Sequence, residues 1–215
     1  MKHFAVILSG SGVYDGSEIH EATMAMLSII QHECTYECFA PDINQRQVIN
    51  HLTGDALDET RNVLVESARI ARGEIKSLHE FDAQLFDAVI FPGGFGVAKN
   101  LSDYATKAEN CEVIPEVRKV IETMHAQNKP IGAMCISPVI IAKVLSNITL
   151  TIGNDEDTVK AITEMGATHV NTSYGEVISD RKNKVFTTPC YMLDSNILDV
   201  YEGAFNLIKS ILEDN

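Results

Sequence analysis

Three short, uninterrupted apolar runs constrain the fold of this 215-residue chain more than any other feature of its sequence. They cover residues 4–8, 88–91 and 131–134. Each run is too short for a helix and lacks the alternation of a half-buried strand, so each is typical of a strand buried on both faces. Segments with a helical spacing of apolar residues, such as residues 115–127, separate the runs. Strands that alternate with helices predict an α/β fold with a mostly parallel sheet covered on both faces.

The remaining segments fit the same plan. The expected elements are a strand at 35–40, a helix at 58–72, a surface insertion at 97–114, a strand at 150–152, a hairpin of 177–179 with 185–187, and a closing helix at 197–212. The sequence contains no internal repeat, low-complexity tract or linker. We therefore expect residues 1–215 to form a single domain.

The charge and the cysteine content exclude several classes of function. The net charge of −13 argues against a nucleic-acid partner or an anionic membrane surface, because both require clustered Lys and Arg. No apolar run is long enough to span a bilayer, and residues 4–8 are too short for the core of a signal peptide. Five cysteines are an odd number, which favours reduced thiols over a disulfide framework. The expected location is the cytoplasm.

Cys135 lies between the third apolar run and a predicted helix that begins near Pro138. Proline costs no hydrogen bond in the first turn of a helix. A sharp strand-to-helix turn exposes the side chain at its tip, and the helix start favours a thiolate through its free N–H groups and partial positive charge. The same layout holds the serine of a nucleophile elbow. The alternative is a buried structural cysteine, because free cysteines are among the most buried residues.

Two other loops are predicted at the same edge of the sheet. Residues 9–17 lead from the first run to Glu18, and the glycines at 93–94 follow the second run. Ligands bind at the carboxyl ends of parallel strands, so Glu18, the glycine turn and Cys135 are expected to converge in one crevice. The glycine turn is either a cradle for an oxyanion or phosphate, or a plain tight turn. The first loop departs from the G-x-G-x-x-G pattern at its third glycine, so a dinucleotide site is not favoured.

Cys34 and Cys38 are four residues apart and share one face of an extended strand. A metal pair would need partner ligands at a suitable spacing, and the sequence offers none, so core packing is the better interpretation. We expect neither a metal nor an organic cofactor.

Seven stretches that span nearly the whole chain carry a family resemblance. They are residues 6–10, 12–21, 48–54, 60–64, 92–96, 98–101 and 187–189. Together they resemble the PfpI-like branch of the class I glutamine amidotransferase-like superfamily, and within it the enhancing-lycopene-biosynthesis (ElbB) proteins. This resemblance implies a flavodoxin-like three-layer sandwich and a homodimer.

The resemblance also implies roles for particular residues. Cys135 would be the nucleophile of the elbow and Glu18 its partner carboxylate. The backbone N–H groups of Gly94 and Ile136 would form an oxyanion hole. The activity attributed to the group is a glutathione-independent glyoxalase, with deglycation of proteins as a related activity.

One departure concerns the histidine that PfpI-like enzymes and amidotransferases usually place near the nucleophile. In this chain Asp155 follows the strand after Cys135, and residues 189–191 (Pro-Cys-Tyr) follow the last strand. Acyl transfer needs a proton shuttle to the leaving amine, so amidase or protease chemistry is not favoured. His20, His169 and Asp155 are the candidates to assist Cys135.

The predicted reaction converts glyoxal to glycolate through a hemithioacetal on Cys135. The N–H groups of Gly94 and Ile136 would hold the oxyanion, and Glu18 would relay the carbon-bound proton during isomerisation to a thioester. Two alternatives remain open. One is a redox-sensing protein whose cysteine is oxidised rather than turned over. The other is an inactive amidotransferase-like subunit that assists isoprenoid biosynthesis through a partner.

Overall fold

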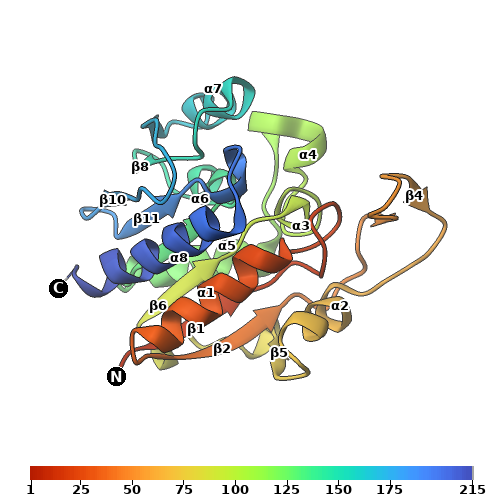
Figure 1. Ribbon diagram of the computed structural model, residues 1–215, viewed down its shortest axis with the longest axis horizontal. Helices are drawn as coiled ribbons and strands as arrows, with labels where there is room; N and C mark the ends of the chain where they lie inside the picture. The colour runs from red at the N-terminus through yellow and green to blue at the C-terminus, as the bar shows by residue number, and fades with distance from the viewer. Residues whose placement is uncertain (215) are drawn as a thin grey trace.

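The computed structural model describes residues 1–214, in which seven strands form a central sheet with helices on both faces (Figure 1). In spatial order the strands are β10 (Ile178–Asp180), β11 (Val185–Thr188), β7 (Ile131–Met134), β6 (Ala88–Phe91), β1 (His3–Ile7), β2 (Thr35–Ala40) and β5 (Ile75–Ser77). Neighbouring strands are parallel except for the pair β10 and β11. The prediction of a flavodoxin-like α/β fold with a mostly parallel sheet is confirmed.

The three apolar runs of the sequence form the adjacent strands β1, β6 and β7. Ala5 pairs in register with Val89, and Val89 pairs with Ile131. All three residues are fully buried. Helices cover both faces of these strands, which is why their sequences show no alternation of polar and apolar residues.

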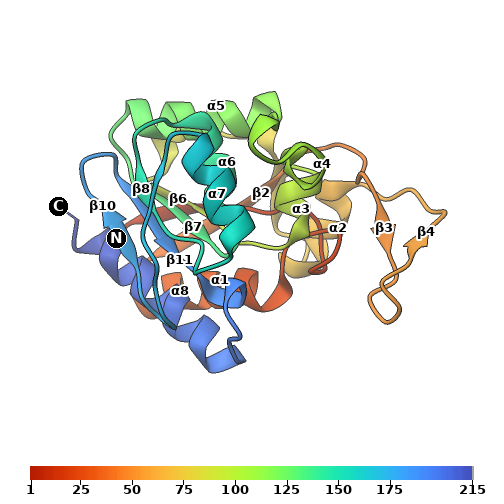
Figure 2. The same ribbon diagram turned by 90° about the horizontal axis from the view of Figure 1, so that it is seen from above.

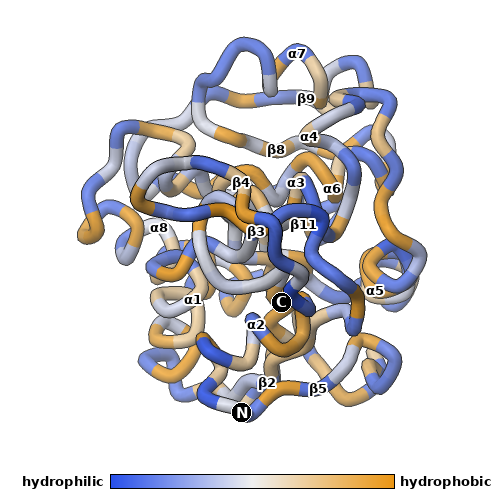
Figure 3. Tube along the Cα trace, turned by 90° about the vertical axis from the view of Figure 1, so that its right-hand side faces the viewer, coloured by the Kyte–Doolittle hydropathy of each residue, from blue (hydrophilic) through white to orange (hydrophobic). Residues whose placement is uncertain are grey.

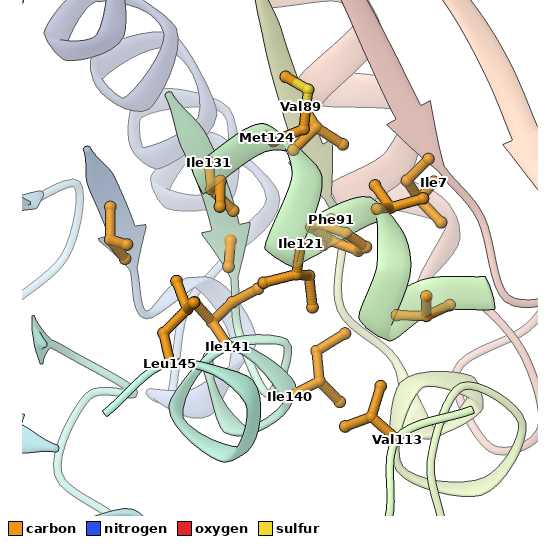
Figure 4. Close-up of a cluster of buried hydrophobic side chains, with 14 of the residues drawn as sticks. Ile7, Val89, Phe91, Val113, Ile121, Met124, Ile131, Ile140, Ile141 and Leu145 are labelled. Carbon is orange, nitrogen blue, oxygen red and sulfur yellow. The ribbon is translucent and has the colours of Figure 1, made fainter. Parts of the chain in front are cut away.

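Two groups of helices cover the two faces of the sheet (Figure 2). The first group is α1 (Ile19–Gln31), α2 (Val63–Ile70) and α8 (Ile197–Leu212), and the second is α3 (Phe95–Lys99), α5 (Pro115–Ala126) and α6 (Pro138–Val144). Each group packs on the sheet through its own hydrophobic core. Figure 4 shows the second core, in which Phe91, Ile121 and Ile140 converge from β6, α5 and α6.

Helix α5 illustrates how the sequence produces this layering. Pro115 begins the helix, where its missing N–H is not needed. Figure 3 shows hydrophobic and hydrophilic residues alternating along the helix. The apolar side chains recur every three or four residues and are buried on one face. They are Val117, Val120, Ile121 and Met124.

The strand predicted at residues 150–152 is β8 (Thr149–Leu150), and it lies outside the central sheet. It pairs with β9 (Thr168–His169) in a separate small sheet. The Thr149 N–H of β8 donates to the side-chain carboxylate of Asp180 in β10 over 2.7 Å, and not to a backbone carbonyl of the central sheet. A side-chain contact of this kind takes the place of a strand ladder, so β8 does not extend the main sheet.

Residues 97–114 are not the surface insertion that their mixed polarity predicted. Val97 in α3 and Leu101 just after it are fully buried in the second core. The short helix α4 (Tyr104–Lys107) follows and packs beside α3. This segment therefore forms part of one wall of the molecule at the carboxyl ends of the strands.

Three further elements lie outside the central sheet. The strands β3 (Val48–Ile49) and β4 (Ala56–Leu57) form a hairpin that projects from the body in both ribbon views, and α7 (Glu156–Glu164) joins β8 to β9. Among residues 1–214, no helix combines the length and the apolar character that crossing a membrane would require.

Asn100, at the end of α3, is expected to stabilise the loops around the site. Its buried side chain donates to the carbonyl oxygens of Ser9 and Asp15 and accepts from the Arg46 N–H, over 2.8–3.0 Å. Asn100→Ala should lower the free energy of unfolding by about 2 kcal/mol or more, because buried polar groups lose their partners. Urea denaturation measures the change, and Asn110→Ala at an exposed position should cost less than about 0.5 kcal/mol. Equal losses in the two variants would contradict the assigned role.

Candidate active site

Cys135 occupies the turn between β7 and α6, at the carboxyl edge of the sheet. Its φ angle of 58° lies in the left-handed region, which costs a non-glycine residue about 1–2 kcal/mol. Its N–H donates to the Thr188 carbonyl on neighbouring β11 over 3.0 Å, which fixes the turn. The side chain is 7% exposed and reaches a pocket. This is the geometry of a nucleophile elbow.

Glu21, in the first turns of α1, contacts the Cys135 thiol. The two side chains both lie against Gly93, close enough for each to shift the pKa of the other. The Glu21 carboxylate also accepts from the Gly93 N–H at 2.9 Å and from the Tyr191 N–H at 3.3 Å. Its side chain is fully buried. Glu21 thus connects the elbow, the glycine turn and the segment after β11.

The sequence analysis assigned the partner carboxylate to Glu18, and the geometry gives the contact with the sulfur to Glu21 instead. Glu18 precedes α1 and caps it, with Oε2 accepting from the Glu21 N–H at 2.7 Å. It still lines the pocket that contains Cys135. Glu21 reaches the sulfur because of the helical period: as the third residue of α1 it faces inward, beside the buried Ala22 and Ala25. In the sequence, the position of Glu21 on the same helical face as Ala22 and Ala25 is the one local sign of this, and it does not by itself separate a buried carboxyl from a capping one.

The pair of Glu21 and Cys135 holds both of its protons near neutral pH. Burial raises the pKa of Glu21 to about 8, and the negative charge of Glu18 adds to the rise. Burial also raises the pKa of the Cys135 thiol well above its usual range, and the Glu21 carboxylate raises it further. The helix start predicted a thiolate, but burial and the carboxylate outweigh it. Because each group shifts the pKa of the other, they lose their protons as a coupled pair.

The glycine turn after β6 has the shape that the pair requires. A Cβ atom added at Gly93 would lie 2.5 Å from both Cys135 Cβ and Glu21 Oε2, so a side chain there would separate the two groups. Gly94 has a φ angle of 101°, and its N–H points at the Cys135 sulfur. Ile136, the residue after the elbow, lines the same pocket as Gly94. The two residues predicted to supply oxyanion donors therefore lie together.

A second buried cysteine, Cys190, lies beside the first. It follows β11 by two residues, has a φ angle of 44° and packs in the same hydrophobic core as Cys135. Burial raises the pKa of its thiol well above the usual range, and the charge of Glu21 adds to the rise. The sequence analysis did not select Cys190, because its neighbours Pro189 and Tyr191 read as an ordinary loop.

A pocket of about 320 Å³ opens above Cys135. Glu18, Gly94 and Ile136 reach it, and so does Asp155, whose carboxylate caps α7 by accepting from the Thr158 N–H. Most of the remaining surface is apolar. It is formed by Val13, Phe95, Ala98, Tyr104, Ala105 and Met192, together with Thr158 and Tyr191.

The two histidines proposed from the sequence lie in different places. The His20 Nδ1 is 2.8 Å from the Tyr191 hydroxyl, and Tyr191 lines the pocket. His169 lies in β9, where its Nε2 accepts from the Ile152 N–H at 3.4 Å. Burial lowers the pKa of His169. His20 therefore contacts a tyrosine that lines the pocket, whereas His169 forms its hydrogen bond within the region of the small sheet.

Side chains suited to metal binding are not clustered in the part of the chain that the structure describes. Across residues 1–214, no group of three or more His, Cys, Asp or Glu side chains is arranged to hold a metal ion. All five cysteines, which fall in this range, are free thiols.

The sheet order and the elbow define a class I glutamine amidotransferase-like architecture, and known structures agree. An isoprenoid biosynthesis protein with an amidotransferase-like domain from Ehrlichia chaffeensis superposes with a TM-score of 0.92 at 37% identity, over 100% of this chain and 99% of that one. A DJ-1 superfamily protein from Salmonella typhimurium shares the fold alone, with a TM-score of 0.61 and 20% identity over 99% of this chain and 91% of that one.

Curated relatives identify the family. The mitochondrial ES1 protein homolog of Rattus norvegicus is 42% identical over 97% of this chain and 82% of its own length. The human mitochondrial glutamine amidotransferase-like class 1 domain-containing protein 3 has the same identity and coverage. No protein-family model matches the sequence. The chain belongs to the class I glutamine amidotransferase-like family, with the ES1 proteins; the narrower ElbB assignment stays a prediction.

The cytoplasmic location expected from the sequence is wrong by this comparison. The rat and human relatives are named as mitochondrial proteins, and so is the ES1 protein of Danio rerio, which is 32% identical over 98% of this chain and 85% of its own length. Cysteine number and hydropathy report on redox state and membrane insertion, and they do not separate two reducing compartments of a cell.

The buried carboxyl of Glu21 should make stability depend on pH. The unfolded chain releases this proton near pH 4.5 and the folded chain near pH 8. Between these values only the folded state holds the proton, so the free energy of unfolding should fall as pH rises, by up to about 1.4 kcal/mol per unit. Glu21→Gln should remove this part of the slope in urea unfolding at pH 5 to 8. Exposed Glu164→Gln is the control and should keep the wild-type slope; identical slopes in all three proteins would refute the assignment.

Proposed function

We propose that this protein is a cofactor-independent glyoxalase, a lyase that converts glyoxal-type dicarbonyls to hydroxy acids, and glyoxal to glycolate. The observation that carries the proposal is the placement of the Glu21 carboxyl beside Cys135 at the base of the pocket. It places a nucleophile against a carboxyl group that can give up its own proton while it takes the thiol proton, in a site with little access for bulk water. Deglycation of proteins is the same chemistry on a dicarbonyl adduct.

The first step is addition of the thiol to one aldehyde carbon. A bond forms between the Cys135 sulfur and that carbon, and the carbonyl oxygen becomes the hydroxyl of a hemithioacetal. The protonated carboxyl of Glu21 gives its proton to this oxygen and takes up the thiol proton, so the net charge of the site does not change. The N–H groups of Gly94 and Ile136 stabilise the oxygen while it carries negative charge.

The second step moves a proton between the two carbons, and we assign it to Glu18. Glu18 faces the pocket, and its negative charge acts on Glu21. It removes the proton of the hemithioacetal carbon, and the second carbonyl oxygen takes up a proton to give an enediol. Glu18 then returns its proton to the neighbouring carbon while the hydroxyl of the first carbon loses its proton, which leaves a glycolyl thioester on Cys135. Water then cleaves the thioester, which releases glycolate and restores the thiol.

The two carboxylates have separate roles because their environments differ. Glu21 is fully buried against sulfur, whereas Glu18 reaches the pocket where the carbon atoms of the substrate bind. The contact between Tyr191 and His20 at the pocket edge offers a path for protons to solvent. We further propose that residues 1–215 act as one domain and that the chain forms homodimers, as its resemblance to PfpI-like proteins implies.

Cys135→Ala should abolish conversion of glyoxal, with a loss of about 10³-fold or more, because no other group can form the hemithioacetal. Glycolate formation measured by NMR tests this expectation. Cys38→Ala, a matched change of another buried cysteine in β2, should keep the activity. Turnover by Cys135→Ala at the wild-type rate would exclude the proposed reaction.

Glu18→Gln and Glu21→Gln should fail in different ways. Glu18→Gln should alkylate with iodoacetamide at Cys135 as the wild type does, but should lose about 10²–10⁴-fold in turnover because an amide cannot accept the carbon-bound proton. Glu21→Gln removes the negative charge that Glu21 carries above about pH 8 and that raises the thiol pKa, so alkylation above pH 8 should become faster while turnover falls. Peptide mapping and glycolate formation measure the two effects. Full turnover by Glu18→Gln would remove Glu18 from the mechanism.

A further inference from the structure

The pocket above Cys135 is larger and more apolar than glyoxal requires. Glyoxal has four non-hydrogen atoms, whereas the cavity of about 320 Å³ falls in the range of sites that hold much larger ligands. Its walls come mainly from α3 and α4, which lie side by side (Figure 1), and from the segment after β11. The apolar side chains at these walls include Phe95, Ala98, Ala105 and Met192. A small dicarbonyl would leave much of this surface against water.

The charges in the pocket are of one sign. Glu18 and Asp155 both line it, and none of its lining residues, all within the described range of the chain, is a Lys or Arg. Lys99 is close in sequence, but its Nζ donates to the Tyr14 carbonyl at 2.9 Å and lines a separate hollow. A carboxylate or phosphate in the pocket would therefore meet two carboxylates without a cation to pair with.

We infer that the pocket selects an uncharged 2-oxoaldehyde that carries an apolar substituent larger than a methyl group, an inference that rests on the proposed function. The aldehyde carbon lies at Cys135, and the substituent covers the walls formed by α3 and α4. Burial of apolar area on both partners favours this ligand. The carboxylates act against anionic analogues, because an unpaired negative charge would lose its hydration without compensation.

Three dicarbonyls of graded chemistry test the inference on the wild-type protein. Phenylglyoxal is uncharged and apolar, glyoxal lacks the substituent, and 4-carboxyphenylglyoxal adds a negative charge to the same ring. The value of kcat/KM for phenylglyoxal should exceed both others by about tenfold or more. Initial rates of hydroxy-acid formation give the three values.

Two variants change the selectivity in opposite ways. Ala105→Trp narrows the pocket at an exposed position of α4 and should lower the ratio of kcat/KM for phenylglyoxal over glyoxal by about tenfold. Asp155→Asn keeps a residue that caps helices well and removes one negative charge. It should raise kcat/KM for 4-carboxyphenylglyoxal relative to phenylglyoxal by several-fold.

Protection of Cys135 from iodoacetamide measures binding without turnover. Acetophenone should slow alkylation more than benzoate at equal concentration. Absence of turnover on every dicarbonyl, with this protection intact, would overturn the proposed glyoxalase and leave the ligand preference standing. A preference for glyoxal or for the carboxylated substrate, or equal protection by benzoate, would overturn the inference itself.

Discussion

The site depends on a close crossing of two backbone segments, the loop after β1 and the glycine turn after β6. The Glu18 N–H donates to the Gly93 carbonyl at 2.9 Å, and the Gly96 N–H donates to the Gly16 carbonyl at 2.9 Å. A side chain at Gly94 would collide with the backbone of Gly16 and Glu18, so the crossing forms only with glycine at that position. This crossing sets where α1 begins, and therefore where its first turn places two carboxylates against the elbow.

The chemistry of the site follows from how differently these two carboxylates are surrounded. They are three residues apart, and the Glu18 carboxylate accepts from the Glu21 backbone N–H, yet the Glu21 carboxyl is enclosed by protein and that of Glu18 faces a cavity. Backbone N–H groups hold the enclosed carboxyl of Glu21 in place, so it keeps its orientation in either protonation state. In the proposed reaction these are two distinct proton carriers from adjoining positions at the start of α1, and the lining of the pocket, which falls within residues 1–214, includes no histidine.

The central strands and the elbow at Cys135 could be predicted because both depend on short, local stretches of sequence. The apolar run before Cys135 and the proline-initiated helix after it predict the turn, and the convergence of three loops at one edge of the sheet favoured a functional cysteine over a structural one. Glu21 could not be selected in the same way, since an acidic residue in the first turn of a helix is usually a solvated or capping group. Its burial depends on Gly93 and Tyr191, which are 72 and 170 residues away in the sequence. Contacts at such separations come from the fold and leave no local pattern.

The buried carboxyl has a consequence for how the nucleophile survives between encounters with substrate. Peroxides attack the thiolate form of cysteine, and the resting pair of Glu21 and Cys135 keeps the sulfur protonated near neutral pH. In the reaction proposed above, an aldehyde bound in the pocket forms a bond with the sulfur as the proton leaves, so the reactive form exists only when a carbonyl is there to trap it. In a compartment rich in oxidants, this arrangement spares the cysteine from irreversible oxidation while its reactivity toward carbonyl compounds is preserved.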